Sequence, residues 1–298
     1  MGLLEGKVVI VTGAGRGIGR GEALEVVRQG GAVVVGEFDG VAGQEVVDEI
    51  VKGGGQAVLV TGDVAEVEVA NTMVATAVAE FGGLDALVNN AGTLRDRTLI
   101  KMAPEEWDTV IRVHLRGHYT TTHAAANYWK DAGRPGHIVC TASTSGLLGN
   151  FGQSNYGAAK AGIAAFANIT AWELRKYNVT VNAIAPAART RMTEGAYGKI
   201  EEAGADFDFW SPDNIAPLVS YLCSDASSHI SGKVFGVEGD IVEIYQPWTS
   251  VAEIGNGGVR WDPEVLATKI DGLLAEGGIA PEITNGMARL RYSMTDRG

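Results

Sequence analysis

The chain has 298 residues, of which 46% are hydrophobic, and its formal net charge is −12 at pH 7. This composition is typical of a globular protein, and the length suffices for one large domain or two small ones. The negative charge argues against a nucleic acid or an anionic membrane as a partner, because both bind basic surfaces. No stretch approaches the ~20 apolar residues that a membrane span requires, so no membrane insertion is expected.

The two cysteines, Cys140 and Cys223, lie in apolar stretches. We expect small buried side chains there rather than a disulfide framework, a usage that suits a reducing compartment. The N-terminal MGLLEGKVVIVTGAG lacks the cationic start and long apolar run of a signal peptide. Both observations favour a cytoplasmic protein. No metal site is expected.

Short apolar runs alternate with helical patterns along most of the chain. The predicted strands are Lys7–Val11, Ala32–Gly36, Ala57–Val64, Leu84–Gly92, His137–Ser143, Val179–Pro186 and Lys233–Gly239. The predicted helices are Arg20–Gln29, Val41–Val51, Val67–Phe81, one long helix over Glu105–Trp129, a helix through Tyr156 to Lys176, and Asp213–Ser224. Strands that are apolar throughout and alternate with helices indicate a parallel sheet buried on both faces.

The predicted fold is therefore a doubly wound α/β (Rossmann) domain over residues 1–240. It has a parallel seven-stranded sheet with helices on both faces. Residues 241–298 do not fit this pattern and form a C-terminal extension, with a helix capped by Asp262 and Pro263 at its first position. We expect the extension to pack on the domain or on a neighbouring subunit, where it could complete that subunit's site; a frayed, self-packed appendage is the alternative.

The first strand is followed by TGAGRGIG, in which Gly13, Gly17 and Gly19 form the pattern TGxxxGxG. Glycines in a strand–turn–helix context let the backbone approach a pyrophosphate at the helix N-terminus. We expect Arg16 and Ile18, in the same loop, to contact the dinucleotide as well.

Glu37 ends the second predicted strand, where a carboxylate can accept hydrogen bonds from the adenosine ribose and repel a 2′-phosphate. Arg16 complicates this reading, because a guanidinium in the glycine loop could bind a 2′-phosphate. We favour NAD over NADP, with Asp39 as an alternative ribose partner.

Two further groups follow the third and fourth strands. Asp63 and Val64 are candidates for the adenine edge. The small residues of Asn90, Ala91 and Gly92 would let a ribose pass close to the backbone, although a purely structural asparagine turn is the alternative.

Ser143, Tyr156 and Lys160 are the candidate catalytic residues. Tyr156 and Lys160 are four residues apart, so they share one face of a helix. A lysine beside a tyrosine lowers the cost of forming a phenolate, whose reference pKa is near ~10. A nearby serine hydroxyl could bind the oxygen of an alcohol or ketone.

In this order, TGAGRGIG, Asp63, NNAG, Ser143, Tyr156, Lys160 and Asn182–Pro186 resemble the short-chain dehydrogenase/reductases over about Met1–Asp240. LRDRTLIKM, EEWDTVIRVHLRGHY and GNFGQSNYGAAKAG narrow the likeness to the (3R)-hydroxyacyl-CoA dehydrogenase unit of peroxisomal multifunctional enzymes, also described as acting on 17β-hydroxysteroids. The resemblance implies that Tyr156 is the general acid/base, that Lys160 lowers its pKa and binds the nicotinamide ribose, and that Ser143 binds the substrate oxygen. It also implies a homotetramer or homodimer.

Two departures from the broad family pattern concern the site. His114 stands where many members carry an asparagine that supports a water relay behind the lysine; the hydroxyacyl-CoA-like branch also has histidine there. A packed helix histidine with a satisfied ring is the competing interpretation. Pro186 is followed by Ala187 instead of the usual glycine, which weakens the case for cofactor contacts near Ala188–Thr190.

Residues 191–212 lie where a substrate-covering lid is expected, and they mix aromatic side chains with acids. A large apolar substrate or packing of the lid on its own domain would each explain the aromatics. Near the C-terminus, Arg289 and Arg291 are weaker candidates for binding CoA phosphates.

The leading hypothesis is NAD-dependent oxidation of a secondary alcohol, with a 3-hydroxyacyl-CoA carrying a bulky or steroid-like acyl part as substrate. The alternatives are a hydroxysteroid or other lipophilic-alcohol dehydrogenase and an NADPH-linked 3-oxoacyl reductase. From another class, a catalytically silent dinucleotide-sensing protein is disfavoured, because Ser143, Tyr156 and Lys160 are all present.

Overall fold

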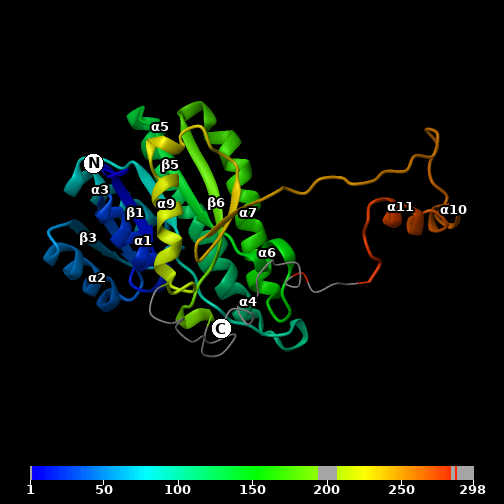
Figure 1. Ribbon diagram of the computed structural model, residues 1–298, viewed down its shortest axis with the longest axis horizontal. Coiled ribbons are helices and arrows are strands. Elements are labelled where there is room, and N and C mark those ends of the chain that lie inside the picture. The colour runs from blue at the N-terminus through cyan, green and yellow to red at the C-terminus, as the bar shows by residue number, and fades with distance from the viewer. Residues whose placement is uncertain (1, 194–206, 283–285, 287–298) are drawn as a thin grey trace.

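The computed structural model describes residues 2–193, 207–282 and 286, and a single twisted sheet forms its centre (Figure 1). Seven strands run parallel, as predicted. They are β1 (Val8–Thr12), β2 (Ala32–Glu37), β3 (Gln56–Thr61), β4 (Ala86–Asn89), β5 (Gly136–Thr141), β6 (Val179–Ala187) and β7 (Val234–Glu238). Their order in space is β3-β2-β1-β4-β5-β6-β7. The chain therefore reverses its winding direction between β1 and β4, where such sheets bind ligands.

The prediction of seven strands was one strand short. An eighth strand, β8 (Ile241–Tyr245), pairs antiparallel with β7 across a two-residue loop at Gly239, whose φ is +51°. It lies at the sheet edge and alternates between half-buried and exposed residues, so it lacks the continuous apolar run of the inner strands. The body of the domain accordingly extends past residue 240 to Tyr245.

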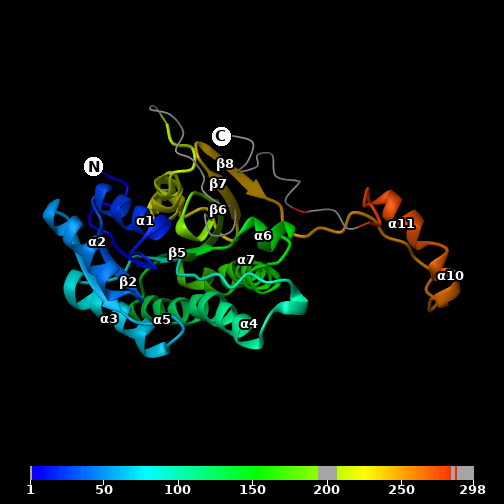
Figure 2. The same cartoon turned by 90° about the horizontal axis from the view of Figure 1, so that it is seen from below.

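Helices cover both faces of the sheet, as Figure 2 shows. On one face lie α1 (Gly17–Arg28), α2 (Gly40–Lys52) and α9 (Ala216–Leu222); on the other lie α3 (Val67–Phe81), α4 (Pro104–Ile111), α5 (Gly117–Ala132) and α7 (Ser154–Leu174). Each face of the sheet packs against its helices in a separate hydrophobic core. Along β1, Val9 and Val11 point into the core on the α1 side, while Val8 and Ile10 point into the core on the α7 side. A strand with both faces buried needs apolar residues at every position.

The single long helix predicted over Glu105–Trp129 is interrupted. Between α4 and α5 the chain forms a π-helical turn, η2 (Arg112–Arg116), that contains His114. Such turns add a residue to the helical repeat and re-aim the side chains they carry. The apolar periodicity runs on through the turn, which is why the sequence pattern reads as continuous.

Short elements complete the fold, namely η1 (Leu99–Lys101), α6 (Thr144–Leu148), η3 (Arg175–Tyr177), η4 (Pro212–Ile215) and η5 (Asp225–Ser227). Cys140 and Cys223 are buried, as predicted. Across the described ranges, no helix combines the length and apolar character that would let it cross a membrane.

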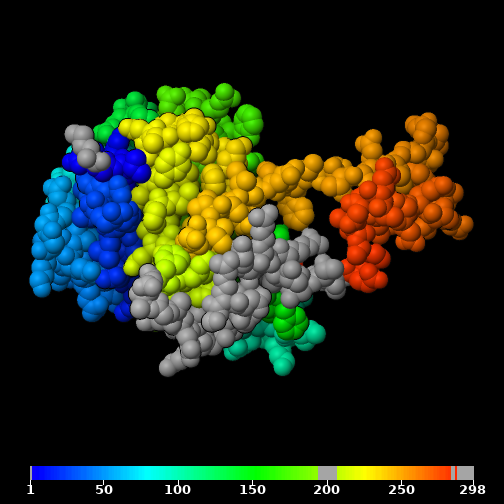
Figure 3. Space-filling model, viewed as in Figure 1, coloured from blue at the N-terminus to red at the C-terminus, as the bar shows by residue number. Residues whose placement is uncertain are grey.

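Beyond β8, residues 246–282 form an arm that leaves the body of the molecule (Figures 1 and 3). It carries α10 (Pro263–Ala267) and α11 (Ile270–Glu276). Asp262 caps α10 by accepting hydrogen bonds from the backbone N–H groups of Glu264 and Val265, as its sequence position predicts.

Candidate active site

A cavity of about 540 Å³ lies at the carboxyl ends of the central strands. It brings together many of the residues predicted for the site, namely Gly13, Arg16, Gly17, Ile18, Glu37, Asn90, Gly92, His114, Tyr156, Lys160 and Pro186. The carboxyl ends of parallel strands meet at one edge of the sheet, which is why segments distant in sequence converge here.

The glycine loop packs tightly against the segment after β4. Gly13 has a φ of +65°, and a Cβ there would lie 2.7 Å from the Cα of Ala91. The Asn90 side chain donates hydrogen bonds to the carbonyls of Thr12 and Gly13 at 3.0 and 3.1 Å. Asn90 thus holds the loop in place while also lining the cavity. Gly19 lies outside the lining, and its missing Cβ makes room for Asn90.

Glu37 is held rigidly at the end of β2. Its carboxylate accepts hydrogen bonds from the backbone N–H groups of Gly15, Phe38 and Asp39 at 2.8, 3.0 and 3.1 Å. Arg16 turns toward Asp39 and donates to its carboxylate at 2.7 Å, which keeps the pKa of Asp39 below its usual range. The carboxylate that lines the cavity is therefore that of Glu37.

Asp63 and Val64 lie outside the lining of this cavity. Asp63 pairs with Arg112 of the π-helical turn and accepts a hydrogen bond from the Ala65 N–H at 2.8 Å. The Val64 carbonyl accepts a hydrogen bond from Thr120. In this structure both residues fasten the loop after β3 to the α4–α5 region, and their contact with an adenine stays a prediction.

Tyr156 and Lys160 lie one turn apart on α7, with the lysine Nζ 5.5 Å from the centre of the tyrosine ring. Lys160 is only 2% exposed, and burial lowers its pKa to about 7. Its ammonium donates a hydrogen bond to the Thr141 carbonyl at 2.5 Å. The lysine is thus fixed beside the phenol and is itself shielded from solvent, so its charge acts strongly on its neighbour.

Ser143 follows β5 and caps α6, accepting a hydrogen bond on its hydroxyl oxygen from the Ser145 N–H at 3.2 Å. It is buried, with 8% of its surface exposed. Since the contact occupies a lone pair, the hydroxyl hydrogen stays available to an oxygen acceptor.

His114 is a buried ring that touches the tyrosine. Its centroid lies 5.2 Å from that of Tyr156 in an edge-to-face contact, and Nε2 lies 2.8 Å from the Thr93 carbonyl oxygen. Burial, reinforced by the charge of Lys160, holds its pKa well below the usual value, so the ring is neutral. A Cβ on Gly92 would overlap this ring, which accounts for the glycine.

The sequence reading missed His118, one turn after His114. It is buried; its Nδ1 donates to the His114 carbonyl at 2.7 Å, and its Nε2 accepts from the Thr141 N–H at 3.2 Å. Burial lowers its pKa to about 3. His118 thereby positions the residue whose carbonyl holds Lys160. The i, i+4 spacing of the two histidines was the available signal.

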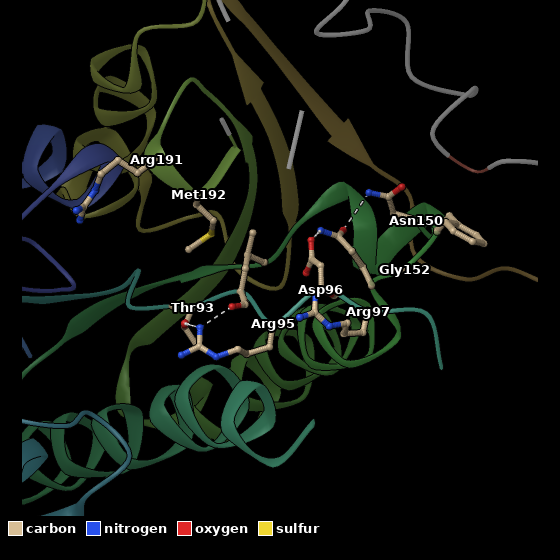
Figure 4. Close-up of a pocket in the computed structure, with 12 residues that line it drawn as sticks. Thr93, Arg95, Asp96, Arg97, Asn150, Gly152, Arg191 and Met192 are labelled. Atoms are coloured by element: carbon tan, nitrogen blue, oxygen red, sulfur yellow. Dashed lines mark hydrogen bonds between the residues drawn. The ribbon is translucent and has the colours of Figure 1, made fainter. Parts of the chain in front are cut away.

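A second cavity, of about 770 Å³, was also missed. The loop after β4 (residues 92–97) and residues 150–153 line it, together with Arg191 and Met192 (Figure 4). Gly92, Arg191 and Met192 line both cavities, so the two adjoin.

The expected lid lies largely outside the described residues, as do Arg289 and Arg291. In its described part, Phe209 and Trp210 are buried and pack edge-to-face at 4.7 Å. These two aromatics pack within their own domain, whereas Phe207 remains half exposed.

A model of the short chain dehydrogenase family matches residues 7–199. The chain belongs to this family. Hydroxyacyl-CoA dehydrogenase ChsB1 of Mycobacterium tuberculosis is 43% identical over 90% of this chain and 89% of its own length. A short chain dehydrogenase from Mycobacterium avium has a crystal structure with a TM-score of 0.85 at 45% identity, covering 95% of this chain and 98% of that one.

The mouse peroxisomal multifunctional enzyme type 2 is 42% identical over 76% of this chain, which corresponds to 31% of that longer protein. The predicted family resemblance is thereby confirmed. Membership makes the chain an oxidoreductase that acts on a CH–OH group with a nicotinamide dinucleotide, NAD or NADP.

Proposed function

We propose that the chain oxidises a 3-hydroxyacyl-CoA to the 3-oxoacyl-CoA, reversibly, with NAD as the hydride acceptor. The observation that carries the chemistry is the buried Lys160, hydrogen-bonded to Thr141 and lying 5.5 Å from the centre of the Tyr156 ring. A buried ammonium beside a phenol favours the phenolate, which is the base that the reaction needs.

The residues of the first cavity fit a dinucleotide. The turn at Gly13 has no room for a Cβ, and the Glu37 carboxylate lies at the end of β2 where the ribose of such a cofactor is bound. NAD, when bound, supplies the hydride acceptor. Glu37 favours NAD because a 2′-phosphate would meet its negative charge. Arg16 is turned toward Asp39, which supports the same preference.

The proton chemistry falls to the residues at the end of β5 and on α7. Ser143 donates a hydrogen bond to the substrate oxygen and orients the carbinol. Tyr156, as the phenolate, accepts the hydroxyl proton while the carbon loses its hydride. Lys160 stabilises the phenolate, and the neutral His114 ring holds Tyr156 in place through its edge contact.

The thioester part of the proposal rests on two observations. The relatives named above are hydroxyacyl-CoA and multifunctional peroxisomal enzymes, and a second cavity of about 770 Å³ adjoins the first. That volume suits a large ligand.

The test compares kcat/KM with NAD for a 3-hydroxyacyl-CoA and for a free hydroxysteroid. We expect the thioester to be preferred, and Tyr156→Phe to abolish turnover while NADH still binds. Substantial activity of Tyr156→Phe would contradict the mechanism. Preference for the free steroid would identify a hydroxysteroid dehydrogenase instead. Preference for 3-oxoacyl reduction with NADPH would identify a 3-oxoacyl reductase.

We also propose that the chain works as a homodimer or homotetramer in the cytoplasm. The arm of residues 246–282 exposes Trp248, Val251 and Val259, whose side chains are 97%, 64% and 70% exposed. Apolar side chains on a segment that leaves its own domain are buried most simply against a second copy of the chain.

A further inference from the structure

The second cavity carries a positive charge in a chain whose net charge is −12. Three of its lining residues are arginines (Arg95, Arg97 and Arg191), and one, Asp96, is acidic. Figure 4 shows Arg95 and Arg97 on the loop after β4, whereas the side chain of Arg191 extends away from them. The chemistry described so far uses none of these four residues.

Hydrogen bonds hold the two loops that wall this cavity together. The backbone N–H of Arg97 donates a hydrogen bond to the Gly152 carbonyl at 2.9 Å, and this bond joins the loop after β4 to residues 150–153. The Gln153 side chain donates to one oxygen of Asp96 at 2.7 Å. The aspartate is thus engaged in holding the two loops together, and its charge is partly satisfied there.

Among the residues that the structure describes, Arg95 has only neutral acceptors. Its guanidinium donates to the Leu94 carbonyl at 2.7 Å and to the Thr93 hydroxyl at 3.3 Å. By contrast, Arg16 and Arg20 hold carboxylates at 2.7 and 2.6 Å. Since a guanidinium has five N–H donors, Arg95 retains donors that no acid occupies.

The other two arginines also lack a close carboxylate partner among the described residues. Arg97 lies 3.6 Å from Glu106, at the long end of an ion pair, and its side chain is 59% exposed. Arg191 is exposed and forms no ion pair with any residue that the structure describes. Arg95 and Arg97 therefore place two cations with few anionic partners on one loop, and an anion bound between them would offset their repulsion.

We propose that Arg95 and Arg97 bind the phosphate groups of coenzyme A, while the acyl carbinol of the same thioester lies at Tyr156. The inference rests on the proposed function, because it assigns a binding site to the coenzyme A part of the thioester substrate. Guanidinium groups bind phosphate oxygens through paired, charge-assisted hydrogen bonds. The two cavities share Gly92, Arg191 and Met192, so one ligand can extend from Tyr156 to Arg95 without leaving the surface.

Phosphopantetheine on a carrier protein offers the same phosphate ester as coenzyme A. Both ligands are anionic, but an acidic carrier protein would meet the chain's net charge of −12 over a much larger surface than CoA, so the charge favours the free cofactor. The arginines would then bind the phosphate groups of the substrate and also attract it to the site by charge.

The test is a calorimetric titration of the NADH-saturated enzyme with free CoA, and with phosphate-free pantetheine as the paired probe. Saturation with NADH prevents the ADP part of CoA from entering the dinucleotide site. Arg95→Ala and Arg97→Ala are each expected to weaken CoA binding about tenfold relative to pantetheine, and the double variant more. Arg175→Ala removes an exposed arginine beside the start of β6, at the opposite edge of the sheet, and is expected to bind CoA like the wild type.

A double variant that folds, binds NADH and still binds CoA within about twofold of the wild type would overturn the inference; the threshold is small against the effect expected of a charged hydrogen bond. Binding of a phosphopantetheinylated carrier protein, with no binding of free CoA, would assign the arginines to that carrier instead. The titration involves no turnover. Arginine-dependent CoA binding without oxidation of 3-hydroxyacyl-CoA would therefore refute the proposed function alone.

Discussion

Lys160 donates a hydrogen bond to the Thr141 carbonyl at 2.5 Å, and this bond joins α7 to the end of β5. Because Thr141 is the last residue of β5, a strand buried along its whole length, the ammonium is anchored to the central sheet. The backbone N–H of Thr141 donates a hydrogen bond to Nε2 of His118 at 3.2 Å. One strand end thus connects the two helices that flank the site.

Lys160→Met should lower kcat/KM at pH 7 by about 10²–10⁴-fold, the usual contribution of an acid–base group. Removing the ammonium raises the cost of the Tyr156 phenolate, so the residual activity should increase steadily with pH. A pH–rate profile of wild type and variant measures this. A profile of unchanged shape would show that Lys160 does not act through the tyrosine.

His118→Ala should reduce kcat/KM roughly 10–100-fold by loosening the Thr141–Lys160 contact, because small displacements in a site are costly. His123→Ala is the matched control, since His123 is an exposed histidine on the same helix. The apparent pKa in the pH–rate profile should move in His118→Ala only. Loss of stability with an unmoved pKa would mean that His118 is merely a packing residue.

Glu22 lies on α1 with both carboxylate oxygens buried and without a hydrogen-bond partner among the described residues. Burial raises its pKa from 4.5 to about 8. The folded state therefore holds a proton that the unfolded state releases above its ordinary pKa. This contribution to stability is complete below about pH 4.5 and is lost as the pH rises toward 8.

Glu22→Met should remove this dependence. Between pH 5 and pH 8 the free energy of unfolding of the wild type should fall by roughly 3 kcal/mol relative to the variant, at about 1.4 kcal/mol per pKa unit. Denaturant titrations at the two pH values measure the difference. The exposed Glu45, changed to Gln, serves as the control, and parallel pH profiles for wild type and Glu22→Met would contradict the assignment.

Glu37→Ala should lower the ratio of kcat/KM for NAD to that for NADP by about tenfold or more, because it removes both a ribose acceptor and a repulsive charge. Initial rates with each cofactor measure the ratio. Asp39→Ala is the comparison. An equal or larger fall in that variant would identify Asp39 as the ribose partner.

Deletion of residues 246–298 should shift the enzyme toward smaller assemblies, since it removes the exposed apolar side chains of the arm. Light scattering of the full chain and the truncated chain at equal concentration measures this. Truncation after Tyr245 leaves β8 paired with β7, so the body of the domain is expected to fold. An unchanged assembly would show that the arm does not join subunits.

The central fold could be predicted because its signals are local. Residues buried on both faces must be apolar, so β1, β2 and β5 appear in the sequence as continuous runs, and a glycine loop marks the turn that follows β1. The edge strand β8 alternates instead of forming a continuous apolar run, and the π-helical turn at His114 adds one residue inside a longer helical pattern. A search for continuous apolar runs and uninterrupted helical repeats therefore misses both.

The sequence alone determined the doubly wound fold, the glycine loop and the Tyr156–Lys160 pair, since each depends on residues close together in the chain. The tertiary structure decided which carboxylate faces the cavity, Glu37 rather than Asp39, and that His118 supports Lys160 through Thr141. It also placed Arg95 and Arg191 at one cavity, although they are far apart in sequence. These relationships depend on how separate segments pack at the edge of the sheet, and no spacing along the chain encodes that packing.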